Sequence, residues 1–105
     1  MTYSDKIAYI AGFYGLETQL VQTAEECAEL AQAALKFRKA LPDDAVTLAA
    51  AREHLIEEMA DVMIMLEQLN FLEACEDKLR EMIERKLDRQ IGRIEGNEAI
   101  HHGDK

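Results

Sequence analysis

The chain has 105 residues, of which 49% are apolar, with five Gly, one Pro and a formal net charge of −9. This length fits a single domain, and the scarcity of turn-forming residues argues against an all-β fold. The negative charge disfavours nucleic acid and anionic membranes as direct partners, because both would repel it. The high apolar content of so small and acidic a domain indicates oligomerisation, which would cover the surplus apolar surface.

The N-terminal half predicts two helices. Ser4 can cap a first helix that runs to about Tyr14. A second helix is expected from about Leu16 to Ala40. It ends before Pro42, because the residue that precedes a proline disfavours the helical conformation.

The C-terminal half predicts two more helices. Asp43 or Asp44 can cap the third, which could start as a separate short helix and is firmly helical in pattern from Arg52 to about Leu69. Beyond that point the apolar stripe changes direction, so we infer a turn there, with a capping pair that begins at Asn70. The last helix is expected over roughly Ala74 to Ile94.

These helices predict an all-α fold: a compact antiparallel four-helix bundle over residues 1–95, completed by oligomerisation and followed by a flexible tail over 96–105. The longest uninterrupted apolar run, Val62 to Leu66, is far too short to span a bilayer. The N-terminus has no secretory signal pattern, and Cys27 and Cys75 suit a reducing compartment. We therefore expect a soluble, cytoplasmic protein with no membrane partner.

An acidic motif occurs twice, once on the second and once on the third predicted helix. The segment from Glu25 to Leu30 reads EECAEL, and the segment from Glu57 to Val62, 32 residues later, reads EEMADV. Residues three apart on a helix project along neighbouring lines, so each motif directs two carboxylates the same way. Two facing helices would bring four carboxylates to one spot, those of Glu26, Glu29, Glu58 and Asp61.

The placement of Glu26 and Glu58 separates a metal site from an ordinary acidic surface. A single acidic motif is usually a solvated helix face. Here both glutamates interrupt an apolar arc, and a buried carboxylate is costly unless it is paired or binds a metal. Hard oxygen ligands in this number suit Mg²⁺, with Mn²⁺ as a possible substitute. A di-iron site is not expected, because neither motif carries the Glu-x-x-His pattern.

Basic residues near these motifs could hold phosphates. Lys86, Arg89 and Arg93 share one strip of the last predicted helix, and Lys36 lies two turns beyond the first motif on the same side. Such cations can bind the outer phosphates of a nucleotide, or they can form ordinary salt bridges in an acidic protein. His54, one turn before the second motif, could support the site or be a partly exposed helix side chain.

The paired motifs, the run EMADVMIML over residues 58–66 and the closing Lys86-x-x-Arg89 resemble the signature of the MazG-like all-α nucleoside triphosphate pyrophosphohydrolases. The resemblance extends from about Tyr14 to Ile94 and is strongest to short stand-alone bacterial or phage members. It implies that the metal ligands are Glu26, Glu29, Glu58 and Asp61. It further implies that Glu25 and Glu57 support the ligands or accept a proton. The substrate-binding candidates are Lys36, Lys86, Arg89, Arg93 and Gln22.

The implied reaction is attack of water on the α-phosphorus of a (deoxy)nucleoside triphosphate, which gives a nucleoside monophosphate and pyrophosphate. It suits nucleotide-pool house-cleaning by a homodimer or homotetramer. One alternative is a non-catalytic MazG-like module that binds nucleotide or a protein partner. Another is an enzyme similar to phosphoribosyl-ATP pyrophosphohydrolase, although the usual N-terminal features of that enzyme are not recognisable here. The motifs do not specify the base.

Overall fold

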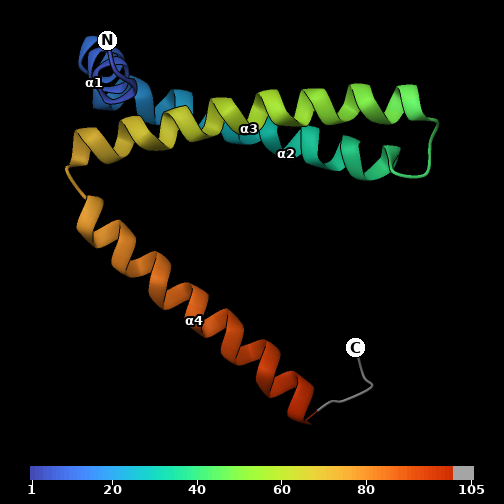
Figure 1. The fold of residues 1–105 in the computed structure, drawn as a ribbon. Coiled ribbons are helices and arrows are strands. Elements are labelled where there is room, and N and C mark those ends of the chain that lie inside the picture. Colours follow the sequence, from blue (N-terminus) through green and yellow to red (C-terminus); the bar gives the residue numbers. More distant parts are fainter. Residues whose placement is uncertain (101–105) are drawn as a thin grey trace. The chain divides into compact units, whose positions relative to one another are not determined.

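The computed structural model describes the backbone of residues 1–100 and the side chains of residues 1–96. Within this part the chain is entirely helical, with no strand and four helices: α1 (Tyr3–Tyr14), α2 (Leu16–Ala40), α3 (Ala45–Glu73) and α4 (Glu76–Ile100) (Figure 1). The all-α class predicted from the sequence is confirmed. None of the helices in the described range is long and apolar enough to cross a membrane.

The chain divides into two units. The first, Met1–Ala74, contains α1, α2 and α3, and the second begins at Cys75 and contains α4. The predicted four-helix bundle and the predicted single domain over residues 1–95 both concern how the two units combine, so both stay predictions.

Helix α1 begins after Thr2 and not after Ser4, so the predicted cap was wrong. The Thr2 hydroxyl accepts a hydrogen bond from the Asp5 amide at 3.0 Å, and the Asp5 carboxylate accepts one from the Thr2 amide at 3.1 Å. This reciprocal pair satisfies two backbone donors. Ser4 cannot form such a pair, because the residue three positions later is Ile7. Gly15 alone separates α1 from α2, and its φ of 84° lies in the region that favours glycine.

Helix α3 is continuous from Ala45 to Glu73, so the option of a separate short helix at its start was wrong. The alanine-rich first turns favour helix throughout and give no reason for a break. Asp44 is the cap, since its carboxylate accepts hydrogen bonds from the Thr47 amide at 2.9 Å and the Thr47 hydroxyl at 3.0 Å. These bonds favour the charged form and lower the pKa of Asp44.

Helices α2 and α3 run antiparallel side by side, and α1 packs against the end of this pair that lies away from the α2–α3 turn (Figure 1). The buried apolar residues are Ala33 and Ala40 on α2 and Ala51, Val62 and Met65 on α3, so three of these five are alanines. Small side chains let the helix axes approach closely. The first unit therefore brings one face of α2 against one face of α3 along most of their length.

A break separates α3 from α4, as the change in apolar phase predicted. It lies at Ala74, whose φ of 47° is left-handed, rather than at a capping pair that begins at Asn70. Helix α4 starts at Glu76 instead of Ala74, and it continues to Ile100 instead of ending near Ile94. The end of the predicted flexible tail, residues 101–105, lies outside the described residues.

Candidate metal centre

Three carboxylates from two helices come together near the middle of the α2–α3 pair. Glu26 of α2 and Glu58 and Asp61 of α3 each offer one carboxylate oxygen, and these oxygens all lie within 4.8 Å of one another. Glu58 and Asp61 are three residues apart, which places both on the side of α3 that faces α2. The antiparallel packing of the two helices supplies the third carboxylate.

Glu58 is the buried member of this group, with 9% of its surface exposed. Its Oε2 atom is inaccessible to solvent and has no hydrogen-bond partner among the described residues. A buried polar atom without a partner costs about 1–3 kcal/mol, and the cost is larger when the atom is charged. A cation held by Glu58 and the two neighbouring carboxylates would give this atom a partner.

Glu29 lies at the exposed edge of the group. A hydrogen bond with Glu26 raises the pKa of Glu29, and the negative charges of Glu26, Glu58 and Asp61 raise it further, with a smaller contribution from burial. All four carboxylates that the motifs singled out are therefore within electrostatic reach of one another. A cation would relieve this repulsion.

Gln22, a predicted substrate-binding residue, contacts the acidic group directly. Its amide nitrogen lies 3.3 Å from Glu26 Oε2, to which it donates a hydrogen bond. This contact is available to orient the Glu26 carboxylate. Glu25 and Glu57, the predicted catalytic residues, are both exposed and lie outside the group of three converging carboxylates.

Sequence reasoning missed a polar contact on the same α2–α3 interface. Gln19 Nε2 donates a hydrogen bond of 2.7 Å to Gln68 Oε1, and both side chains are buried. Gln19 precedes Glu26 by seven residues, and Gln68 follows Asp61 by seven, so each lies two turns from a motif on the same helix face. That spacing was a usable signal.

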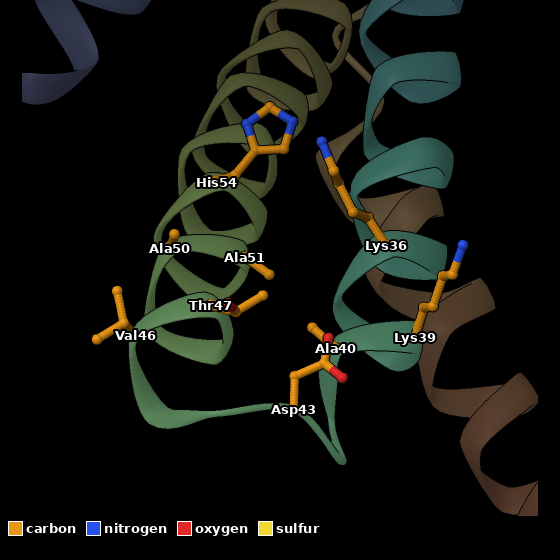
Figure 2. A pocket seen from close by; sticks show the side chains of 9 residues that line it. All are labelled: Lys36, Lys39, Ala40, Asp43, Val46, Thr47, Ala50, Ala51 and His54. Carbon is orange, nitrogen blue, oxygen red and sulfur yellow. The ribbon is translucent and has the colours of Figure 1, made fainter.

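The predicted basic residues lie in two places. Lys36, on α2, lines a cavity of about 530 Å³ at the α2–α3 turn, together with Lys39 and His54 (Figure 2). Lys86 and Arg89 line a smaller pocket of about 250 Å³ on α4. Arg93 is exposed on the same helix. The three α4 residues belong to the second unit, and their role toward the carboxylates stays a prediction.

The donor set fits a hard divalent cation. It consists of carboxylate oxygens alone, without nitrogen or sulfur, which is the chemistry that Mg²⁺ and Mn²⁺ prefer. Glu58 supplies a fixed, buried oxygen, while the half-buried Glu26 and Asp61 leave the site open on one side. An open side is what a catalytic metal requires if water and a phosphate are to bind it.

In comparisons with known proteins, no family model, no curated protein and no solved structure matches this chain. Membership of a family is therefore not shown, and the resemblance of the motifs stays a prediction. Any proposal of function depends on the geometry of the carboxylate group.

Proposed function

We propose that the protein is a magnesium-dependent hydrolase that converts a (deoxy)nucleoside triphosphate into a nucleoside monophosphate and pyrophosphate. The observation that carries this proposal is the buried, unpartnered Glu58 Oε2 within a cluster of converging carboxylates. Burying a carboxylate without a partner costs free energy, so an acidic surface without a function would leave this side chain in solvent. The paired motifs, which resemble those of MazG-like pyrophosphohydrolases, supply the reaction class. We assign the activity to the cytoplasm and to house-cleaning of the nucleotide pool.

Glu26, Glu58 and Asp61, with Glu29 at the edge, would hold the cation. A bound Mg²⁺ would lower the pKa of a water molecule and neutralise charge that develops on the phosphate oxygens. The packing of Glu58 fixes its side chain, and Gln22 holds the Glu26 carboxylate through its amide. A preorganised ligand set of this kind lowers the cost of orienting water and substrate.

The reaction joins the oxygen of water to the α-phosphorus and breaks the bond from that phosphorus to the bridging oxygen. The bridging oxygen leaves with pyrophosphate. Glu25 and Glu57 are exposed next to ligand positions, where a carboxylate can accept the proton that the water releases. They are the assigned proton acceptors in this scheme.

Large apolar side chains on the surface support a homodimer or homotetramer. On α3, Met59, Met63 and Leu66 are 46%, 60% and 50% exposed. On α4, Leu79 and Ile83 are 41% and 47% exposed. Exposed apolar side chains at helical spacing form faces that a second copy of the chain can cover, which would complete the predicted bundle.

A screen for pyrophosphate release tests the proposed function. Canonical and modified ribo- and deoxyribonucleoside triphosphates are each incubated with the protein and Mg²⁺ or Mn²⁺. We expect at least one of them to yield equimolar monophosphate and pyrophosphate, and we expect a chelator to abolish the reaction. Release of orthophosphate in place of pyrophosphate would contradict the reaction class. Absence of turnover across the whole panel would favour a non-catalytic helical module.

A further inference from the structure

Two buried glutamines join α2 to α3 at the end of the pair that lies away from the α2–α3 turn. Gln19 Nε2 donates a hydrogen bond of 2.7 Å to Gln68 Oε1, and the two residues are 4% and 2% exposed. Gln68 also donates to the Met65 sulfur at 3.6 Å, and a thioether is a weak acceptor. A buried amide costs free energy unless it is hydrogen-bonded. These two side chains therefore favour the alignment of the helices in which they meet.

The glutamine pair and the converging carboxylates belong to the same alignment of α2 and α3. In an antiparallel pair, a step of seven residues forward on one helix corresponds to a step of seven residues back on the other. Glu26 lies seven residues after Gln19, and Asp61 lies seven residues before Gln68. The alignment in which the glutamines meet therefore also brings Glu26 against Asp61, and one oxygen of each lies within 4.8 Å of the other.

Apolar packing and the connecting turn determine this alignment only loosely near the carboxylates. Three of the five buried apolar residues on α2 and α3 are alanines, whose shallow ridges resist sliding less than large side chains do. The turn over residues 41–44 ties the helices together at one end only. Glu26 lies about 21 Å along the axis from Ala40, so a tilt of about 15° about the turn would move it by about 5 Å. That displacement is as large as the distance across the carboxylate group.

We propose that Gln19 and Gln68 are positioning residues for the three converging carboxylates. Their hydrogen bond ties the helices together at the end remote from the turn, so that α2 and α3 are held on both sides of the carboxylates. A single buried polar contact can select one alignment of packed helices at some cost in stability. The effect of the pair on metal binding and turnover rests on the proposed function, whereas its effect on the alignment of the metal-free protein does not.

Two variants separate positioning from stability. Gln19→Met/Gln68→Met replaces both amides by apolar side chains of similar shape, so no buried amide loses its partner and the urea midpoint should not fall. The hydrogen bond is lost, and Mn²⁺ affinity measured by calorimetry should weaken by about tenfold, the lower end of the range for residues that orient metal ligands. Gln68→Glu keeps the acceptor for Gln19 Nε2 but buries a carboxyl group, so the urea midpoint should fall while Mn²⁺ affinity does not weaken. Gln32→Met, on the exposed side of α2, is the control and should change neither quantity.

The alignment itself is measured in the metal-free protein as the distance between two spin labels. One label is attached to Cys27 of α2 and the other to Ala60→Cys of α3, in a Cys75→Ser background. Both labelled positions are exposed, and each adjoins one of the converging carboxylates. An excess of unlabelled chain suppresses distances between copies. We expect one narrow distance distribution for the wild-type pair and for Gln68→Glu, and a broadened or shifted distribution for Gln19→Met/Gln68→Met.

The proposal is overturned if the double variant retains the wild-type distances, or if its distances change while its Mn²⁺ affinity does not. It is overturned equally if Gln68→Glu weakens Mn²⁺ binding as much as the double variant does, since affinity would then follow stability. Absence of Mn²⁺ binding by the wild-type protein would overturn the proposed function, and the distances would still decide whether the pair sets the alignment. Metal binding without turnover of any triphosphate would overturn the proposed function alone.

Discussion

Replacing Glu58 by Gln distinguishes between two roles of this residue, that of a metal ligand and that of an acidic surface residue. The substitution keeps the shape of a side chain that is only 9% exposed and removes its charge. In the wild-type protein, one oxygen from each of the three carboxylates lies within 4.8 Å of the other two. Two unit charges at that distance repel by about 1 kcal/mol in water and about 3.5 kcal/mol at an effective dielectric constant of 20. We therefore expect Glu58→Gln to raise the stability of the metal-free protein by on the order of 1 kcal/mol or more.

The metal-bound protein should behave in the opposite way. A cation present at 100 times its dissociation constant stabilises the folded state by about 2.7 kcal/mol. In a domain of this size each kcal/mol shifts Tm by roughly 4–8 °C. Wild-type Tm should therefore rise by roughly 10–20 °C in saturating Mg²⁺ or Mn²⁺. Glu58→Gln should lose most of that rise, because it removes the buried ligand.

Thermal unfolding followed by circular dichroism, at increasing metal concentration, measures both effects. Glu53→Gln provides the matched control, since Glu53 lies on the same helix, is exposed and is outside the motif. Its stability, with and without metal, should follow that of the wild-type protein within about 0.5 kcal/mol. The reasoning is refuted if millimolar metal does not shift wild-type Tm, or if Glu58→Gln retains the full shift.

Three further predictions concern the fold and the assembly. Gln68→Ala should destabilise the protein by about 1–3 kcal/mol in urea unfolding, because it leaves the buried Gln19 amide without a partner; a loss below about 0.5 kcal/mol would show that the bond contributes little. The pKa of Asp44 is lowered in the folded state, so its contribution to stability is present above its unfolded pKa and is lost as pH falls through its folded pKa. Asp44→Ala should remove that pH-dependent part of the stability, and an unchanged acid limb of the stability curve would contradict the capping role. Light scattering at micromolar concentration should give two or four times the chain mass of 11.9 kDa, and a monomer would contradict the assembly.

Helix boundaries were predictable where the local chemistry was decisive. Gly15 and Pro42 delimit α2, which begins at Leu16 and ends at Ala40 as predicted. The start of α1 is determined by a reciprocal capping pair, which requires an acidic residue three positions after the cap. Thr2 has that partner in Asp5, and Ser4 does not. The break before α4 was inferred because the apolar stripe changes direction around the helix. Such a change shows that a turn is needed but locates it only to within a few residues.

The convergence of carboxylates was predictable because it depends on helical spacing and on which face is apolar. Glu58 and Asp61 share a face of α3, and the apolar arc around Glu58 indicated that it would be buried. The spacing of Gln19 and Gln68 from the motifs places each on the interface side of its helix, but their contact was not predicted, because it also depends on the antiparallel register of α2 and α3. The cavity at the α2–α3 turn was missed for the same reason, because Lys39 and His54 line one cavity only when the two helices are aligned.

The most direct test of the central claim is the rate of metal-dependent pyrophosphate release by wild-type, Glu58→Gln and Glu53→Gln proteins on the triphosphate that the screen identifies. If Glu58 is a metal ligand, Glu58→Gln should lower turnover by orders of magnitude while the circular dichroism spectrum stays helical. Glu53→Gln should retain the wild-type rate. Wild-type turnover by Glu58→Gln, or an equal loss in both variants, would contradict a metal centre at Glu26, Glu58 and Asp61.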